Sequence, residues 1–197
     1  MLLNDAPQAG EPRPSDWLQR WLHLLPARAR ILDVACGSGR NLRWLAAQGF
    51  ALTGVDRDAA ALAPLARSAE IVAADLEQGP WPFQGRHFDA VLVTRYLWRP
   101  LLPRIVDSVD EGGFVIYETF ADGQQTIGRP ARADFLLQPG ELLRACKDLR
   151  IVAYEDGFIA GPPARFVQRI VACRRPPEHA RFALPPACPP TAGRADG

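Results

Sequence analysis

Gly37 and Gly39 lie in the stretch 33–41, Asp-Val-Ala-Cys-Gly-Ser-Gly-Arg-Asn, where residue types and spacing favour ligand binding. The apolar residues 31–32 before this stretch indicate a buried strand, and apolar residues at helical spacing follow it over 42–46. Glycine has no Cβ, so this strand-to-helix turn can be sharp and a ligand can lie against the backbone. The first N–H groups of a helix have no partner within it and bind polar ligand groups. The turn therefore predicts a nucleotide-like ligand, although two glycines can also serve only to turn the chain.

Two more acidic residues stand where the next two strands should end. Asp56 follows the apolar run 51–55, and Asp75 follows the run 71–74. Acids at three strand ends suit a ligand with a ribose, an adenine amino group and an ammonium group, because carboxylates accept hydrogen bonds from all three. Leu42 stands where dinucleotide-binding proteins have a third glycine, and no Gly-Lys-Ser/Thr follows, which disfavours nicotinamide cofactors and excludes a P-loop. Alternatively, Asp56 caps the next helix and Asp75 is only a loop acid.

Three segments, LDVACGSGRN, GVDRD and AADLE, resemble the glycine-rich motif and the two strand-end acids of the class I S-adenosylmethionine-dependent methyltransferases. The resemblance covers about residues 30–173, and CGSGRNLRWLAAQGF is most similar to the small bacterial tellurite-resistance (TehB-like) and thiopurine methyltransferase group. Ala35 departs from the pattern, because many members have glycine there. The resemblance implies S-adenosylmethionine as cofactor, with contacts from Asp33, Ala35, Cys36, Gly37, Gly39, Asn41, Asp56, Arg57, Asp75, Leu76 and Thr94. Asp33 either faces the methionine amine through water or only orders the glycine turn.

Strand and helix patterns alternate along most of the chain, which predicts a parallel sheet with helices on both faces. The segments 149–156 and 165–174 both have strand patterns, and their short connection forces an antiparallel pair. The resemblance implies that the last strand lies antiparallel between the fifth and the sixth. We therefore expect an α/β fold, a Rossmann-like doubly wound sheet of seven strands that is mostly parallel with the last strand antiparallel.

The domain organisation follows from composition and periodicity. We expect a flexible N-terminus (1–14), one methyltransferase domain (15–175) and a Pro-rich disordered tail (176–197). Ser15 is expected to cap a helix that carries Trp17 and Trp21 on its apolar face. That face either covers the sheet or lines the mouth of a substrate site.

Local patterns predict the remaining boundaries. Apolar periodicity indicates a helix over 100–109, followed by a turn at 111–113, where two glycines occur. Pro64 interrupts the helix that starts at Asp58, so we expect that helix to be short or kinked. Pro139 is expected at the first position of a later helix, where its missing N–H costs nothing.

The catalytic candidates lie beyond the carboxyl ends of strands, where open α/β sheets bind ligands. Glu118 closes the predicted fifth strand and is a candidate base or orienting carboxylate; its alternative is a salt bridge to a nearby arginine. Tyr96 follows the fourth strand and either contacts the substrate or cofactor or packs in the core. Methyl transfer depends mainly on alignment, worth up to about 7–11 kcal/mol. A base is needed only for a nucleophile with a high-pKa proton, and no histidine stands in these segments.

Three arginines are candidates for substrate binding. Arg95 and Arg99 either recognise an anionic substrate or are solvated charges at a helix start. The long segment 121–138 is expected to be a lid, and Arg129 within it is a candidate substrate contact. Arginine stays protonated, so none of the three can serve as a base.

A small molecule, with a soft or anionic nucleophile, is the methyl acceptor that the sequence favours. VTRYLW, after the fourth strand, lacks the Pro-Pro-aromatic motif of amino-methyltransferases, a nucleophilic cysteine and the lysine of a ribose 2′-O site. The chain has no appended RNA-binding domain or basic tail, which disfavours a nucleic-acid partner. The alternatives are a methyltransferase acting on RNA or protein through its arginines, and a protein that binds S-adenosylmethionine without catalysis.

Composition bounds the remaining possibilities. The 197 residues are 48% hydrophobic with a formal net charge of +1, which fits one globular domain and demands no polyanionic partner. The four cysteines form no C-x-x-C motif, and the three histidines are scattered, so we expect neither a metal site nor a disulfide framework. No signal peptide or membrane-spanning run is visible, and we expect a cytoplasmic protein. Nothing in the sequence indicates its oligomeric state.

Overall fold

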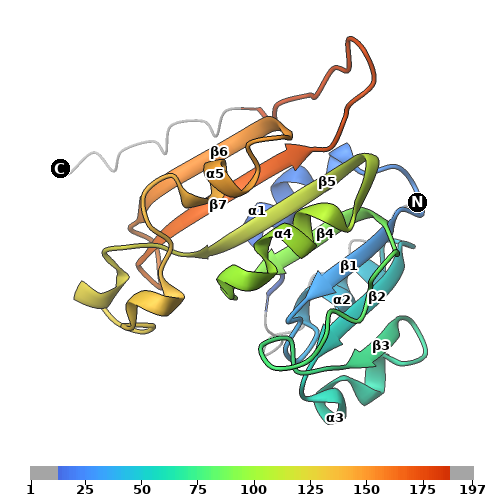
Figure 1. Ribbon diagram of the computed structural model, residues 1–197, viewed down its shortest axis with the longest axis horizontal. Helices are drawn as coiled ribbons and strands as arrows, with labels where there is room; N and C mark the ends of the chain where they lie inside the picture. The colour runs from blue at the N-terminus through green and yellow to red at the C-terminus, as the bar shows by residue number, and fades with distance from the viewer. Residues whose placement is uncertain (1–12, 187–197) are drawn as a thin grey trace, which may run out of the picture.

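A seven-stranded sheet in the order β3-β2-β1-β4-β5-β7-β6 forms the centre of the molecule (Figure 1). The computed structural model describes residues 13–186. The strands are β1 (Arg30–Val34), β2 (Ala51–Asp56), β3 (Glu70–Ala73), β4 (Phe88–Thr94), β5 (Val109–Phe120), β6 (Arg150–Ile159) and β7 (Arg165–Cys173). Strands β1 to β5 pair in parallel, whereas β7 is antiparallel to both of its neighbours, β5 and β6. The expected fold and the insertion of the last strand are confirmed.

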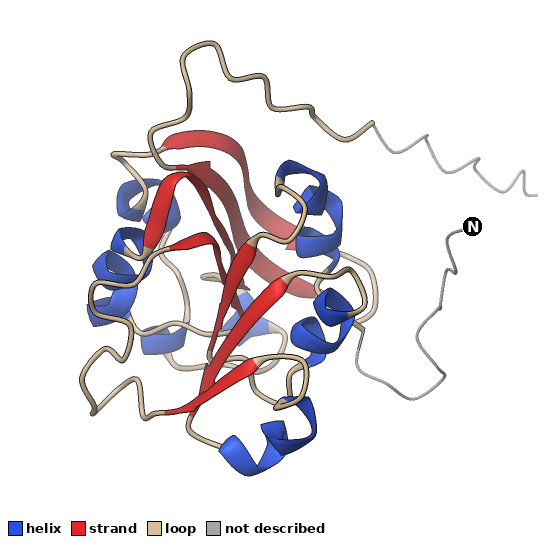
Figure 2. Cartoon of the chain, turned by 90° about the vertical axis from the view of Figure 1, so that its right-hand side faces the viewer, coloured by secondary structure: helices blue, strands red, loops and turns tan. Residues whose placement is uncertain are grey.

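Helices cover both faces of this sheet (Figure 2). They are α1 (Asp16–Trp21), α2 (Arg40–Ala46), α3 (Ala59–Leu62), α4 (Leu102–Asp107) and α5 (Glu141–Ala145), with short 3-10 turns η1 (Leu22–Leu24), η2 (Ala63–Leu65), η3 (Arg99–Leu101), η4 (Gln124–Thr126) and η5 (Ala133–Phe135). Side chains alternate along β4, so Ala90 and Leu92 pack with α1, α2 and α3, and Val91 and Val93 pack with α4 and α5. This two-sided burial explains the continuous apolar run.

Several predicted boundaries need correction. The helix expected over 100–109 ends at Asp107, and β5 already begins at Val109. The expected turn at 111–113 lies inside β5, where Gly112 has a φ of 75° and the pairing with β4 shifts register. Pro139 lies before α5 rather than at its first position, because Gly140 with a φ of 68° is the N-cap. The interruption at Pro64 is confirmed, since α3 ends at Leu62 and continues only as η2.

The N-terminal helix α1 covers the sheet rather than lining a substrate mouth. Ser15 caps it, its hydroxyl accepting a hydrogen bond from the Leu18 N–H at 3.2 Å. Trp17 and Trp21 are only 1% and 2% exposed, and the Trp17 indole N–H donates to the Ile170 carbonyl of β7 at 3.2 Å. Of the two roles that the sequence left open for this helix, covering the sheet is therefore the correct one.

The chain after β7 runs without helix or strand as far as residue 186. Within this part, the Phe182 ring packs edge-on against Phe114 with ring centroids 5.7 Å apart, and a His23 ring nitrogen lies 2.9 Å from the Ala183 carbonyl oxygen. Most of the predicted N-terminal segment and the end of the predicted tail lie outside the described residues. No helix within residues 13–186 is long and apolar enough to cross a membrane.

Candidate functional site

A cavity of about 260 Å³ lies at the carboxyl ends of β1 to β4, and we name it the strand-end cavity. Its lining consists of residues that follow directly on those strands: Ala35, Asp56, Arg57, Ala74, Asp75, Leu76, Glu77, Arg95 and Tyr96. Five of the predicted cofactor contacts, both strand-end acids among them, therefore meet in one hollow. The parallel order β3-β2-β1-β4 brings them together, because it places these strand ends along one edge of the sheet.

Asp56 closes the glycine turn from the neighbouring strand. Its carboxylate accepts hydrogen bonds from the Gly37 N–H at 2.8 Å and the Asp58 N–H at 3.1 Å. The helix cap is Asp58, which accepts from the Ala61 N–H at 3.3 Å, so Asp56 is not the N-cap. Each oxygen of Asp56 keeps a second lone pair that can accept a ligand hydroxyl.

The two glycines of the turn have different roles. Gly37 and Gly39 both have positive φ values, 56° and 76°. A Cβ on Gly37 meets open space, whereas one on Gly39 comes within 2.3 Å of the Leu65 Cδ1 atom. Ala35, the departure from the glycine pattern, also has a positive φ of 52°, which explains why glycine is favoured there. Gly39 therefore packs the turn against the α3 segment, and Gly37 leaves room beside the cavity.

Asp75 orders the loop after β3 and also borders the strand-end cavity. One of its carboxylate oxygens accepts hydrogen bonds from the Glu77 N–H at 2.9 Å and the Gln78 N–H at 3.2 Å. Leu76 beside it is buried. Asp75 therefore both orders the loop and lines the strand-end cavity. A role in the loop alone does not explain why it lines the cavity.

Asp33 is fully buried, and neither of its carboxylate oxygens has a hydrogen-bond partner among residues 13–186. Burial raises the pKa of Asp33 to about 7, an effect that Asn41 and Arg40 oppose. A buried carboxylate without a partner is costly unless a ligand supplies one. An ammonium group is the ligand chemistry that this carboxylate fits.

Arg40, at the start of α2, is a residue that the sequence reasoning missed. One guanidinium nitrogen donates to the Arg13 carbonyl at 3.1 Å, and the other, Nη2, is buried with no partner in the described part of the chain. Burial, and next the positive charge of Arg95, lower the pKa of Arg40. Its position directly after Gly39, at a helix start, is the sequence signal that could have identified it.

Three further residues that the sequence predicts as cofactor contacts, Asn41, Thr94 and Cys36, make contacts within the protein. The Asn41 side chain accepts from the Ser15 N–H at 3.0 Å and donates to the Thr94 hydroxyl at 3.0 Å. Burial raises the pKa of the Cys36 thiol, whose sulfur lies close to Gly54. The Asn41 side chain thus joins the start of α1 to the end of β4. This is a structural role for a residue that the sequence predicts to contact the cofactor.

A second cavity of about 300 Å³, named the lid cavity, adjoins the first and shares Glu77, Arg95 and Tyr96 with it. Its other lining residues are Leu97, Thr119, Phe120, Pro130 and Phe135. The last two belong to the segment 121–138, so this segment does cover a cavity, as a lid should. The Tyr96 hydroxyl is buried without a partner among residues 13–186, and burial raises the pKa of Tyr96.

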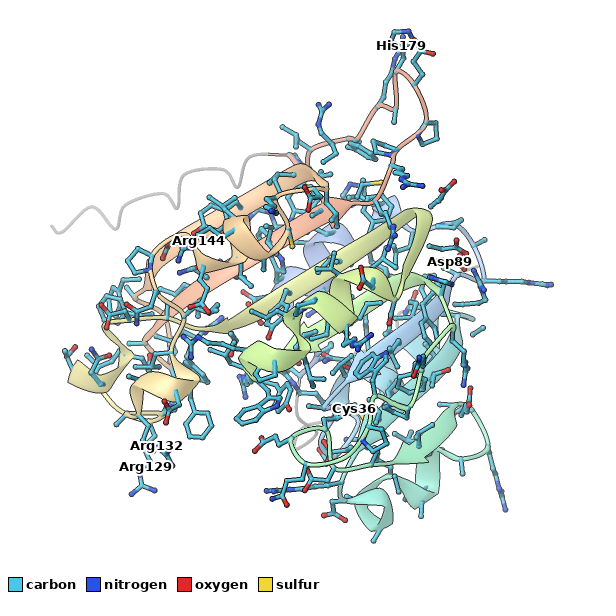
Figure 3. All side chains as sticks on the ribbon, in the orientation of Figure 1. Cys36, Asp89, Arg129, Arg132, Arg144 and His179 are labelled. Carbon is cyan, nitrogen blue, oxygen red and sulfur yellow. The ribbon has the colours of Figure 1, made fainter. Side chains whose placement is uncertain are left out.

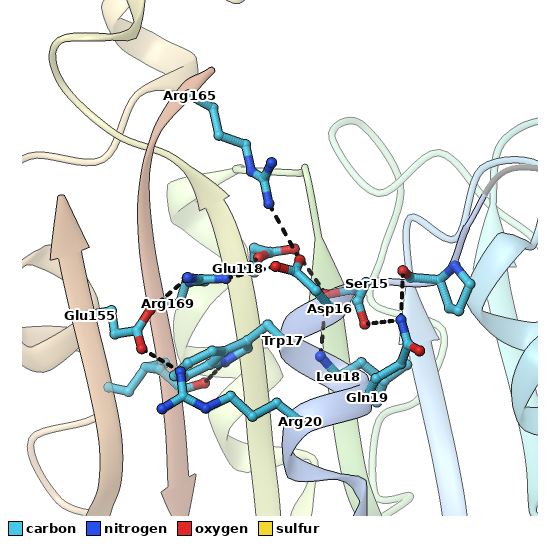
Figure 4. A network of polar contacts seen from close by, with 12 residues as sticks. Ser15, Asp16, Trp17, Leu18, Gln19, Arg20, Glu118, Glu155, Arg165 and Arg169 are labelled. Carbon is cyan, nitrogen blue, oxygen red and sulfur yellow. Dashed lines mark hydrogen bonds and ion pairs between the residues drawn. The ribbon is translucent and has the colours of Figure 1, made fainter. Parts of the chain in front are cut away.

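Glu118 is held in a network of charges rather than left free (Figure 4). One of its oxygens accepts from the Ser15 hydroxyl at 2.9 Å, and the other lies 3.3 Å from the Arg169 guanidinium. Arg169 also pairs with Glu155 at 2.6 Å and with Asp16 at 3.4 Å. This geometry corresponds to the salt-bridge alternative, and it argues against Glu118 as a free base.

Two of the three predicted substrate arginines lie away from both cavities. Arg99 forms a bidentate ion pair with Glu141 at 2.7 and 2.9 Å. Its guanidinium also donates hydrogen bonds to the carbonyls of Asp134 and Leu136 at 2.9 and 2.8 Å. Because these contacts use its guanidinium, Arg99 anchors the lid and is not free for a substrate. Arg129 is exposed, and its side chain points away from the body of the molecule (Figure 3).

Part of the chain matches a known domain family, and its fold is similar to several solved structures. Residues 31–113 match a protein-family model described as a methyltransferase domain. The fold is similar to that of TehB from Haemophilus influenzae, with a TM-score of 0.62, 18% identity and 81% of this chain covered. The match covers 61% of TehB, so this chain spans less than two thirds of the length of that protein. A TehB-like S-adenosylmethionine-dependent methyltransferase from Corynebacterium glutamicum has a TM-score of 0.60 at 19% identity, with 80% of this chain and 86% of that chain covered.

A third similar structure contains a cofactor analogue. The glycopeptide N-methyltransferase MtfA, complexed with sinefungin, has a TM-score of 0.58 at 15% identity, with 86% of this chain and 98% of that chain covered. Sinefungin is an analogue of S-adenosylmethionine. No curated protein matches this sequence.

Proposed function

We propose that this chain is a class I S-adenosylmethionine-dependent methyltransferase that transfers the methyl group to a small-molecule acceptor in the lid cavity. One observation carries this proposal: the strand-end cavity and the lid cavity share Glu77, Arg95 and Tyr96. A cofactor in the first and an acceptor in the second would therefore be adjacent, with these three residues at their common border.

Asp56 and Asp75 line the strand-end cavity, and Asp33 and Arg40 flank the glycine turn without lining the cavity; each suits one part of the cofactor. Asp56 suits the ribose hydroxyls, and Asp75 suits the adenine amino group. Asp33 and Arg40 carry opposite charges, and each has buried polar atoms without a partner in the described residues, which suits the ammonium and carboxylate of the methionine end. When bound, S-adenosylmethionine supplies a methyl carbon on a cationic sulfur, which keeps the bonding electron pair and leaves as a neutral thioether.

The chain's own part in the reaction is alignment and exclusion of water. The lid segment closes the second cavity with Pro130 and Phe135, and Tyr96 borders both cavities. Alignment of this kind is worth up to about 7–11 kcal/mol. Glu77 is the one carboxylate in the lid-cavity lining and no histidine is there, which supports an acceptor whose nucleophile needs no strong base.

Isothermal titration with S-adenosylmethionine, S-adenosylhomocysteine and NAD, side by side, tests the cofactor assignment. We expect binding of the first two only. In Asp56→Ala, the affinity for S-adenosylhomocysteine should fall by about 1–3 kcal/mol, because ribose hydroxyls lose their acceptor. Unchanged binding removes Asp56 from the site. A salt-dependent affinity for tRNA contradicts the small-molecule acceptor.

A further inference from the structure

Arg95 is a cation of the lid cavity whose guanidinium has no ion-pair partner among residues 13–186. Three other arginines at this end of the sheet do have carboxylate partners: Arg99 pairs with Glu141, Arg169 with Glu118, and Arg165 with Asp16. Arg95 instead lines both cavities, and it is exposed. A charge that faces a cavity without an internal partner is available to a ligand.

The backbone holds Arg95 in an unfavourable conformation. Its φ is 59°, and its N–H donates to the Glu118 carbonyl at 2.9 Å. A left-handed conformation costs an ordinary residue roughly 1–2 kcal/mol. Such strain persists where the surrounding structure fixes it, frequently at binding sites. The hydrogen bond to β5 therefore fixes the backbone of Arg95 at the border of the two cavities.

Charges of both signs surround Arg95: Glu77 lines both cavities with it, and other arginines lie nearby. After burial, the charge of Arg95 is the largest influence that lowers the pKa of Arg40. Arg165 and Arg95 line a narrow crevice together with Glu118, Thr119 and Phe120, and the Glu118 carboxylate there is already paired with Arg169. The Arg165 guanidinium lies 3.3 Å from Asp16, a long ion pair. An anionic group beside Arg95 would relieve the repulsion between these cations.

The rest of the lid cavity is largely apolar. Leu97, Phe120, Pro130 and Phe135 contribute its hydrocarbon surface. An inorganic oxyanion such as selenite would use Arg95 and leave these side chains without contacts. A volume of about 300 Å³ suits a molecule with an apolar or aromatic body.

We infer that the methyl acceptor is a small organic anion whose apolar or aromatic body lies against Leu97, Phe120 and the lid, with its carboxylate bound by Arg95. This inference rests on the proposed function, because it requires the cofactor in the strand-end cavity. The carboxylate anchors the acceptor, and a different atom of the molecule receives the methyl group.

Calorimetric titration of the protein, saturated with S-adenosylhomocysteine, tests this inference. The probes are two matched pairs, benzoate with benzamide and indole-3-acetate with indole-3-acetamide. We expect each acid to bind about tenfold more tightly than its amide, the gain of one charge-assisted hydrogen-bonded pair. Arg95→Gln should abolish this preference, and Arg95→Lys should keep part of it. Arg104→Gln, the same charge change on the exposed side of α4, should leave it intact.

Equal binding of acid and amide to the wild-type protein overturns the inference, and so does a preference that survives in Arg95→Gln. Selenite methylation with no binding of either acid also overturns it. Binding of S-adenosylhomocysteine is measured first for every variant, which reports folding as well. If the wild-type protein fails that step, the proposed function fails; if it passes and the acids show no preference, only the inference fails.

Discussion

Asp33 and Arg40 are opposite charges in one buried region that do not neutralise each other directly. The carboxylate has no hydrogen-bond partner among residues 13–186, and neither has Nη2 of the guanidinium. Isolated buried charges cost several kcal/mol unless they are paired. A zwitterion, with one ammonium and one carboxylate, satisfies both at once. The amino-acid end of S-adenosylmethionine has this chemistry.

Arg40→Met should therefore weaken the binding of S-adenosylhomocysteine without affecting 5′-methylthioadenosine, which lacks the amino-acid end. The expected loss for S-adenosylhomocysteine is about 1.5–3 kcal/mol, the range for a hydrogen bond to a charged group. Isothermal titration of both ligands gives the comparison, and Arg40→Lys should recover part of the loss. Equal losses for the two ligands would mean that the substitution disturbs the whole turn and that Arg40 does not read the carboxylate.

Asp33 should make cofactor binding depend on pH. Because burial raises its pKa to about 7, the unliganded protein holds a growing fraction of neutral Asp33 as the pH falls below that value. An ammonium group binds the ionised form, so the affinity for S-adenosylhomocysteine should fall by up to about tenfold for each pH unit below 7. The raised pKa also has a consequence for stability: the unliganded protein gains stability at low pH and loses it as the pH rises through about 7.

Asp33→Asn removes the titrating group and is the control for this prediction. Its affinity for S-adenosylhomocysteine should be weak and nearly independent of pH between about 5 and 8, because asparagine does not ionise. Titration of 5′-methylthioadenosine should give a flat profile with the wild-type protein as well. A steep profile with that ligand would assign the pH dependence to another group.

At the scale of elements, the glycine turn between β1 and α2 separates packing from ligand binding. Gly37→Ala places its new methyl group in open space and costs only the left-handed strain of roughly 1–2 kcal/mol. Gly39→Ala adds a clash with Leu65, for a further 1–3 kcal/mol or so. Urea unfolding should therefore rank Gly39→Ala as the less stable variant.

The ligand-binding order of these two variants should be the reverse of their stability order. Gly37→Ala fills open space at the glycine turn, so its affinity for S-adenosylhomocysteine should fall more than that of Gly39→Ala. If Gly37→Ala binds like the wild-type protein, the space beside Gly37 is not where the cofactor lies. Ala35, already left-handed with a φ of 52°, is the natural reference, and Ala35→Gly should change stability by less than about 1 kcal/mol.

At the scale of the whole molecule, the chain order explains what the sequence could predict. Asp56 and Asp75 each follow an apolar run, and consecutive parallel strands bring such ends to one edge, so the pattern located them correctly. The partner of Glu118 was not predictable in this way. It is Arg169, its cross-strand neighbour on β7, and that register depends on β7 entering the sheet between β5 and β6. The position of Arg40 after Gly39 was visible in the sequence, but its burial was not, because it depends on segments distant in sequence.

The charge network of Glu118 and Arg169 joins α1 to three strands of the sheet. Glu118 lies on β5, Arg169 on β7 and Glu155 on β6, and Ser15 brings in the start of α1 from 103 residues away. Glu118 and Arg169 are 6% and 9% exposed. Removing Arg169 leaves the buried Glu118 carboxylate without its charged partner, whereas removing Glu118 leaves Arg169 paired with Glu155 and Asp16. The network therefore determines how α1 docks on the sheet. Its loss should lower the free energy of unfolding more than it lowers the rate of methyl transfer.

A double-mutant cycle tests this structural role of Glu118. Arg169→Gln should lower the free energy of unfolding by about 3–5 kcal/mol, because it leaves the Glu118 carboxylate unpaired. Glu118→Gln should cost less, because Arg169 keeps Glu155 and Asp16, and the double variant should lose less than the sum of the two. Arg20→Gln breaks the exposed pair with Glu155 and should cost no more than about 1 kcal/mol. Urea unfolding followed by tryptophan fluorescence measures all four variants, since Trp17 and Trp21 report on α1. A Glu118→Gln variant as stable as the wild-type protein, yet unable to turn over, would restore Glu118 as a base and leave α1 to dock by its apolar face alone.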